Sequence, residues 1–335
     1  MIPFASWSVL TVDFLIVLHL CLAGVALPCL LHLVNAKWRY EVRHIAVAFF
    51  ALYPLAVVLL LILLFGGELT FPWVGSFEHL PKWNNLKFLR VREIAGIIVV
   101  GVAYGAFVRM QKTSEQSPEN MARFKILASI IPFIHVLYCT MVAWDFEMTL
   151  LPNWESSMFS VNYIVSVSGM FLASFVILLY TLQSTGLIKQ PIRLQVFNYL
   201  AQMMLGFTIL WIYTFFGQYL IIWYGNITEE TGRIYQMQYG DYSPLFWAFF
   251  VMKFIIPFVT LVFPFSRHNP KVIFTIACII VTGTWIERYT WISGTYPTPH
   301  FPMTGTFDIG VTVSVAVMAF LIVRAKLRST KVIKP

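Results

Sequence analysis

The stretch "IAVAFFALYPLAVVLLLILLF", from Ile45 to Phe65, contains no charged residue over its 21 positions. A helix rises about 1.5 Å per residue and the hydrocarbon core of a bilayer is about 30 Å thick, so about 20 apolar residues cross it. The stretch is therefore long enough to cross a membrane as one helix. It predicts an integral membrane protein.

The overall composition indicates the same class of protein. The chain has 335 residues, of which 59% are hydrophobic and 11% are charged, and its mean hydropathy is +0.76. Soluble globular domains carry about 25% charged residues. This difference excludes an ordinary water-soluble fold, and no stretch has the composition of a separate soluble domain. We therefore predict one polytopic, all-α membrane domain over residues 1–335.

Further apolar runs of spanning length occur on both sides of this stretch. Together they predict nine transmembrane helices, which are Leu10–Val34, Ile45–Phe65, Glu93–Met110, Phe124–Leu150, Ser160–Leu182, Val196–Trp223, Pro244–Phe265, Val272–Ile292 and Phe307–Val323. The connections are rich in Gly, Pro, Asn and charge, as helix ends usually are. The most polar connection, "QKTSEQSPEN" (Gln111–Asn120), is predicted to be an exposed connector without secondary structure.

The distribution of Lys and Arg predicts the orientation in the membrane. Sixteen of the 23 lie in the first, third, fifth and seventh connections and the C-terminal tail, and six lie on the other side. Because basic residues favour the cytoplasmic side, we expect the N-terminus outside and the C-terminus in the cytoplasm of a bacterial inner membrane. The net charge of +8 is thus a topology signal and does not indicate nucleic-acid binding. The first apolar run lacks a basic n-region, so no cleavable signal peptide is expected.

The cysteines give no sign of a metal or redox centre. All four (Cys21, Cys29, Cys139 and Cys278) lie in apolar runs, and no two form a CxxC motif. Zinc, iron–sulfur and c-type haem motifs are therefore absent from the sequence. For a b-type haem, His19 and His135 are the only candidate ligands near the middle of the membrane.

Several ionisable residues lie inside predicted spans, where they are costly and are often functional. Five acids lie at the predicted outer ends of spans, with Arg288 beside one of them, and three basic side chains lie deeper. The acids are Asp13, Asp145, Glu147, Glu287 and Asp308, and the deeper residues are His19, His135 and Lys253.

Structural roles are the alternative for each of these residues. Asp13 and Asp308 could cap helix N-termini. Glu287 and Arg288 could form an ion pair at the interface. Both histidines could be hydrogen-bonded core residues. Lys253 lies about 14 Å into its span by the helix rise, so we expect a buried partner or a water-lined cavity around it.

Three segments resemble the NrfD-like quinone-interacting membrane proteins, and most of all the ActF-type subunits of alternative complex III. They are "AWDFEMTLLPNWESSMFSVNY" (Ala143–Tyr163), "LAQMMLGFTILWIYTFFGQYLIIWYGNITEET" (Leu200–Thr231) and "WIERYTWI" (Trp285–Ile292). The similarity covers about Phe124–Ile292. It implies two four-helix bundles, formed by helices 2–5 and 6–9, and one additional helix.

The resemblance also implies a function and a set of partners. Such proteins are subunits of a complex that oxidises quinol or menaquinol, with haem and iron–sulfur clusters on partner subunits (an NrfD-like paralogue, an iron–sulfur protein and a haem c protein). Any enzyme activity would belong to that complex, with lipids around it and no nucleic acid. The implied proton pathway comprises Asp13, His19, His135, Asp145, Lys253 and Glu287. The implied quinone contacts are His135, Asp145, Glu287 and Arg288.

One position departs from the family pattern. Six residues before Asp145, where the quinol-handling relatives carry a His, this chain has Cys139, and His135 lies one turn earlier. The departure favours a proton-conducting or scaffold role over a quinone site in this chain, whereas the Glu287–Arg288 pair is typical of the quinol-handling relatives. Two other classes stay open, a stand-alone secondary transporter and a purely structural membrane anchor.

Overall fold

The computed structural model describes residues 4–75, 80–296 and 300–334, and over these ranges the chain is helical. Nine helices in them are long and apolar enough to cross a membrane, which confirms the predicted all-α, multi-pass class. The uninterrupted crossings are α1 (Phe4–Leu33), α4 (Leu86–Thr113), α5 (Pro118–Phe146), α6 (Phe159–Ser184), α7 (Leu194–Gly225), α12 (Pro270–Ser293) and α13 (Thr306–Ser329).

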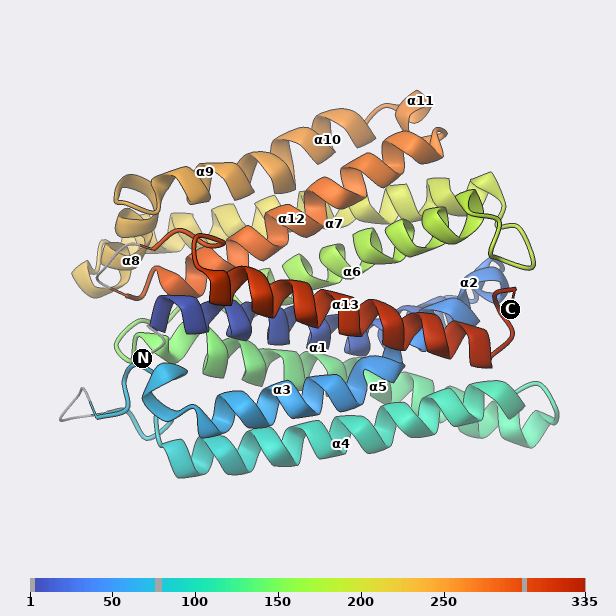
Figure 1. Cartoon of the computed structure of the whole chain (residues 1–335), viewed down its shortest axis with the longest axis horizontal. Coiled ribbons are helices and arrows are strands. Elements are labelled where there is room, and N and C mark those ends of the chain that lie inside the picture. Colours follow the sequence, from blue (N-terminus) through green and yellow to red (C-terminus); the bar gives the residue numbers. More distant parts are fainter. Residues whose placement is uncertain (1–3, 76–79, 297–299, 335) are drawn as a thin grey trace.

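The other two crossings are composite. The second consists of α2 (Arg39–Ala46), η1 (Val47–Leu52) and α3 (Tyr53–Phe65), and the seventh of α9 (Ser243–Phe250), η4 (Val251–Ile255) and α10 (Ile256–Leu261). Four short elements lie between crossings, namely η2 (Gly67–Leu69), η3 (Met148–Leu150), α8 (Thr228–Tyr239) and α11 (Pro264–Arg267). The start of α1 and the end of α13 lie at opposite ends of the long axis, as an odd number of crossings requires (Figure 1).

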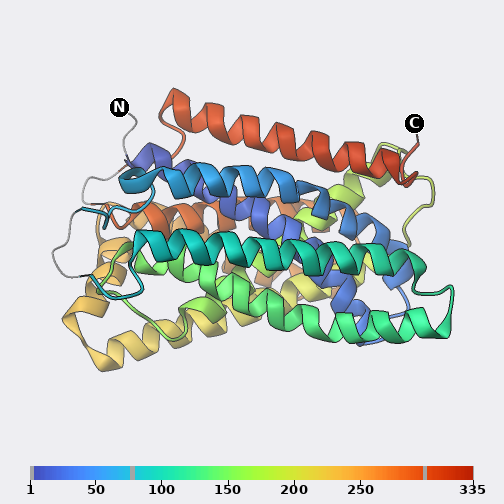
Figure 2. The ribbon, with the colours of Figure 1, turned by 90° about the horizontal axis from the view of Figure 1, so that it is seen from below.

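The crossings pack as two groups with a helix on the outside. The first group contains α1 to α5, and the second contains α6, α7, the α9–α10 crossing and α12. The last helix, α13, packs on α1 and η1 and lies along the edge of the molecule (Figure 2). By these contacts the two bundles comprise crossings 1–4 and 5–8, rather than 2–5 and 6–9, and the additional helix is the last one.

The first crossing is the structural centre of the molecule. It is more completely buried than any other crossing and contacts helices of both groups, including α5, α6 and α12. Polar side chains on α1 therefore lie between the two bundles, where they can reach partners in either one.

Helices extend beyond the apolar runs because polar caps hold their ends. The side chain of Asn85 accepts a hydrogen bond from the Phe88 amide, and that of Ser117 accepts one from Asn120. Such caps satisfy amides that the first turn of a helix leaves free. The predicted connector Gln111–Asn120 is consequently wrong for most of its length. Helix α4 continues to Thr113 and α5 begins at Pro118, so only four residues separate them.

Candidate functional site

A buried lysine lies at the irregular turn of the seventh crossing. Lys253 is 4% exposed, and its Nζ donates to Oε2 of Glu287 on α12 and, at 2.5 Å, to Oγ of Ser166 on α6. The same ammonium group lies 4.6 Å from the ring centre of Trp211. Burying an isolated charge in an apolar medium is prohibitively costly, so such charges are paired. The partner expected from the sequence is thus Glu287.

The adjacent arginine joins this pair to a third helix. Arg288 donates from Nη2 to Oε1 of Glu287 at 2.8 Å and from Nη1 to Oε2 of Glu147 at 2.7 Å. All these side chains are almost completely buried. We call Glu147, Lys253, Glu287 and Arg288 the central ionic network. It contains two acids and two bases, so the charges balance when all four are ionised.

The local backbone explains why Lys253 reaches this network. Pro257 has no amide hydrogen and lies four residues after Lys253, so it cannot make the helical bond to the Lys253 carbonyl. The helix widens there into the π-helical turn η4, and such turns often occur at functional sites. On the facing helix, a Cβ at Gly283 would lie 2.9 Å from Cβ of Met252 and 3.0 Å from Cγ of Lys253. Glycine therefore allows α12 to approach this turn closely.

Four buried polar atoms in and beside this network have no hydrogen-bond partner among the described residues. They are Oε1 of Glu147, Nε of Arg288, Nε of Arg233 and Nε1 of Trp291. Arg233, on α8, donates to the carbonyls of Glu147 at 2.9 Å and Trp291 at 2.7 Å. Burial lowers the pKa of Arg233 to about 9, against the opposing effect of Glu147, so the guanidinium stays charged at neutral pH. Unpaired buried atoms of this kind are the usual partners of internal water.

A second run of polar groups leads from the network into the first bundle. The hydroxyl of Tyr163 shares a 2.7 Å hydrogen bond with Nε2 of His19, and Nδ1 of His19 lies 3.8 Å from Sγ of Cys139. The same sulfur lies 3.7 Å from Nε2 of His135, whose Nδ1 shares a 2.8 Å hydrogen bond with the hydroxyl of Tyr104. We call these five residues the histidine chain. All five are buried.

The histidine chain begins beside the central ionic network. The guanidinium carbon of Arg288 lies 4.8 Å from the ring centre of Tyr163. Polar groups thus follow one another from α12 through α6, α1 and α5 to α4. Hydroxyl, imidazole and thiol groups both donate and accept hydrogen bonds, which is the property that proton transfer along a chain requires.

The positions of the two histidines do not suit a haem between them. Sγ of Cys139 contacts one nitrogen of His19 and one of His135, and so occupies the space between the rings. The other nitrogen of each ring already shares a hydrogen bond with a tyrosine hydroxyl. Among the described residues, no group of three or more His, Cys, Asp or Glu side chains is placed to hold a metal ion.

Asp145 lies in a separate cluster with its own arginine. Arg92 donates from Nε to Oδ2 at 2.7 Å and from Nη2 to Oδ1 at 2.5 Å, and Trp83 donates to Oδ1 at 2.8 Å. The neighbouring Glu93 is also fully buried; its Oε2 accepts a 3.5 Å hydrogen bond from the Tyr138 hydroxyl, and its Oε1 has no partner among the described residues.

The two remaining acids, Asp13 and Asp308, lie on the first and last crossings. Asp13 lies in the third turn of α1 rather than at its start, so it is no helix cap, and it accepts bonds from Trp285 at 3.0 Å and Thr312 at 2.8 Å. Asp308 lies in the first turn of α13 and accepts from the amide of Gly305 at 3.4 Å, as the capping interpretation predicts.

Two of the predicted pathway residues face cavities. His135 lies in the wall of an apolar cavity of about 240 Å³ between α1, α5, α6 and α7, where Ser168 is the other polar residue. Asp13 lies in the wall of a second apolar cavity, of about 340 Å³, between α1, η1, α6, α12 and α13. A much smaller cavity of about 10 Å³ adjoins Lys253 and Ser166, which is near the minimum space for one water molecule.

The structure therefore divides the predicted site residues into groups. Lys253, Glu287 and Arg288 lie together, His19 and His135 form part of one chain, and Asp13 and Asp145 lie apart from both. Sequence reasoning missed Arg92, Glu93, Tyr104, Tyr163 and Ser166. The adjacent charges Arg92 and Glu93 at the start of the third span were a usable signal, since intramembrane charges need partners. The tyrosines and the serine gave none.

No protein-family model matches the chain, and no curated protein is significantly similar to it in sequence. The chain is a multi-pass membrane protein with nine candidate spans among the described residues.

Proposed function

We propose that the chain is an integral membrane subunit of a quinol-oxidising electron-transfer complex, in which it contributes a proton pathway. The observation that carries the proposal is the succession of buried polar groups across the two bundles. It runs from Lys253 and Glu287 to Arg288, whose guanidinium lies over the Tyr163 ring, and on through His19 to Tyr104. Burying so many ionisable groups within the crossings is costly, and the resemblance of three segments to NrfD-like proteins supplies a role for them.

The chemistry assigned to this chain is proton transfer beside the reacting quinol. Oxidation of a quinol to a quinone releases two electrons and two protons. Haem and iron–sulfur groups on partner subunits would take the electrons, because the sequence carries no motif for such a group. The apolar cavity at His135 offers an aromatic ring access to one member of the histidine chain. Its apolar walls with few polar groups are typical of small-molecule sites.

This assignment implies one orientation of the chain in the membrane. The N-terminal end, which holds the central ionic network and the Asp145 cluster, faces the outside of a bacterial inner membrane, and the C-terminal end faces the cytoplasm. Cysteines introduced at Gln116 and Glu155, which are exposed at opposite ends, test this orientation. We expect a membrane-impermeant thiol reagent to label position 155 in intact cells and position 116 only after lysis. The reverse pattern would overturn the topology.

Purification of the complex tests the function most simply. Extraction in mild detergent through a tag on this chain is expected to bring along a haem c protein and an iron–sulfur protein, with quinol oxidation by the purified material. A chain that purifies alone, from a membrane that still oxidises quinol, would contradict the proposal.

The second candidate is a secondary transporter, and one observation favours it. The seventh crossing is interrupted at η4, where Lys253 is buried, and broken helices at such depths form substrate sites in many transporters. A transporter would function in proteoliposomes without partners. Solute or proton exchange by the purified chain alone would favour this candidate over the first.

A further inference from the structure

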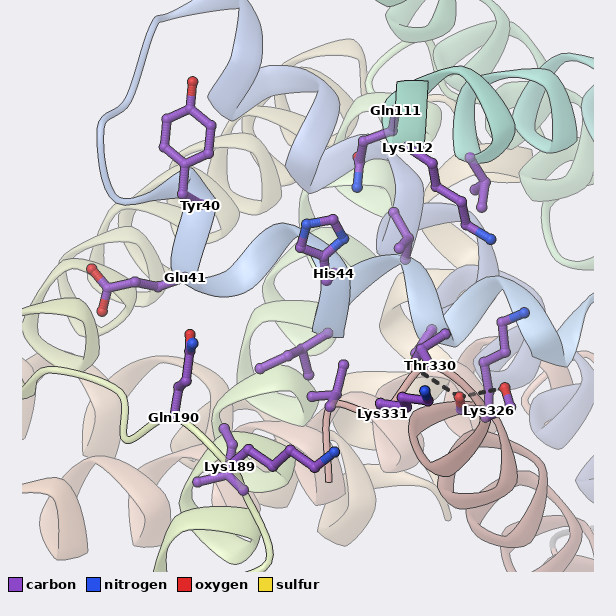
Figure 3. Close-up of a pocket in the computed structure, with 17 residues that line it drawn as sticks. Tyr40, Glu41, His44, Gln111, Lys112, Lys189, Gln190, Lys326, Thr330 and Lys331 are labelled. Atoms are coloured by element: carbon purple, nitrogen blue, oxygen red, sulfur yellow. Dashed lines mark hydrogen bonds between the residues drawn. The ribbon is translucent and has the colours of Figure 1, made fainter. Parts of the chain in front are cut away.

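A basic pocket lies at the C-terminal end of the molecule, far from the central ionic network along the crossings. Its volume is about 580 Å³. Figure 3 shows that four separate segments surround it: α2 with Glu41 and His44, the end of α4 with Gln111 and Lys112, the connection after α6, and the end of α13. No residue of the pocket belongs to the proposed proton pathway.

The pocket carries an excess of positive charge that the chain itself does not neutralise. Four lysines line it, Lys112, Lys189, Lys326 and Lys331, and none of them forms an ion pair within the part of the chain that the structure describes. Glu41, an acidic residue that also lines the pocket, already forms an ion pair with Arg193. Like charges gathered in one hollow repel one another, so an anionic ligand would stabilise them.

The walls of the pocket are held in place by backbone contacts. The amide of Lys189 donates to the carbonyl of Val332 at 3.2 Å, and the amide of Lys334 donates to the carbonyl of Leu187 at 2.7 Å. These bonds tie the C-terminal tail to the connection between α6 and α7. Lys189 and Lys331, which come from segments far apart in the sequence, are thereby kept on the same side of the hollow (Figure 3).

Part of the pocket wall is apolar. Ile45, Val47, Ala48, Val108 and Val332 contribute to its walls, and the first four belong to membrane crossings. The lysines come from the ends of crossings or from connections, where the bilayer meets water. A site that is cationic at the membrane surface and apolar below it matches an amphiphile with an anionic head.

We propose that this pocket binds the headgroup of an acidic phospholipid that carries two phosphate groups. The four ammonium groups would contact the phosphates, and the acyl chains would lie along the apolar wall toward α4 and the second crossing. Such a lipid would link α2, α4 and α13 with the connection that follows α6.

The test uses the full chain in nanodiscs of phosphatidylcholine, with and without cardiolipin, and native mass spectrometry of the bound lipid. The variant Lys189→Gln/Lys331→Gln removes two of the four charges. The matched control, Lys125→Gln/Lys271→Gln, removes two exposed lysines that do not line the pocket. Each surface lysine strengthens the binding of an anionic lipid about five-fold, so we expect the pocket variant to bind cardiolipin about 25-fold more weakly. The control should bind it as the native chain does.

Two results would overturn the proposal. One is a pocket variant that retains cardiolipin as well as the control. The other is release of cardiolipin by an equimolar amount of pyrophosphate, which would show that a soluble anion occupies the pocket. Both readouts are independent of quinol oxidation, so a failure here would leave the proposed function untouched.

Discussion

The hydroxyl of Tyr163 lies 2.7 Å from Nε2 of His19, and this hydrogen bond joins α6 to α1 across the boundary between the two bundles. On one side of it lies the central ionic network, and on the other side lie Cys139, His135 and Tyr104. The proposed route for protons therefore crosses from one bundle to the other instead of running within a single bundle.

Replacement of Arg288 by Gln is expected to destabilise the protein severely. Arg288 pairs with both Glu147 and Glu287, and its removal leaves the buried carboxylate of Glu147 without a cation, whereas Glu287 keeps Lys253. Breaking a buried ion pair from one side costs about 3–5 kcal/mol. Thermal unfolding of the detergent-solubilised chain measures the effect.

The double variant Glu147→Gln/Arg288→Gln is the matched control for that experiment. It removes one charge of each sign, so the remaining pair, Lys253 and Glu287, carries no net charge. We expect it to melt at a higher temperature than Arg288→Gln alone. A double variant that is no more stable than the single one would show that Glu147 and Arg288 are not energetically coupled.

Gly283→Ala is expected to lower the stability by about 1–3 kcal/mol, the usual cost of overpacking. The new methyl group would lie 2.9 Å from Cβ of Met252 and would push α12 away from η4. Gly206→Ala on α7 is the control, because no atom of the described residues that could clash lies within 4 Å of its added Cβ. If the unfolding curves of Gly283→Ala and Gly206→Ala coincide, the close packing at Lys253 is contradicted.

The two acids of the Asp145 cluster are expected to respond differently to neutralisation. Asp145→Asn leaves Arg92 buried without its carboxylate, and should cost about 3–5 kcal/mol. Glu93→Gln removes no ion pair that the structure describes and keeps an acceptor oxygen for the Tyr138 hydroxyl. It should change the stability by less than about 1 kcal/mol. Equal losses in thermal unfolding would show that Glu93, too, is held as a charged partner.

The fold could be predicted to a large extent because burial in lipid leaves a strong pattern in the sequence. Uncharged runs such as Ile45–Phe65 identify the crossings directly. The pattern fails at helix ends, where Asn85 and Ser117 extend helices into polar segments. It also carries no information on which helices pack together, so the grouping of crossings 1–4 and 5–8 came only from the structure.

The candidate site could be predicted only in part. The cost of intramembrane charge singles out Lys253 and Glu287, and the depth of Lys253 predicts a buried partner. Side-chain pairings between helices cannot be predicted in this way, because they depend on the rotation of each helix about its axis and on how closely two helices approach. Nothing in the sequence joins Arg288 to Glu147, which is 141 residues away, or Tyr163 to His19. Neutral hydroxyl groups in apolar helices are also too common to be recognised as relay groups.

The most direct test of the account is the rate of quinol oxidation, with its coupled proton release, in the purified complex that carries Tyr163→Phe. Phenylalanine keeps the ring beside Arg288 but removes the hydroxyl that contacts His19. Tyr180→Phe on the same helix is the control, since its ring packs on Phe274 outside the histidine chain. The account predicts a decrease of about 100-fold for Tyr163→Phe, a magnitude typical of losing a proton-transfer group, and native rates for the control. Native rates of both oxidation and proton release in a fully assembled Tyr163→Phe complex would contradict it.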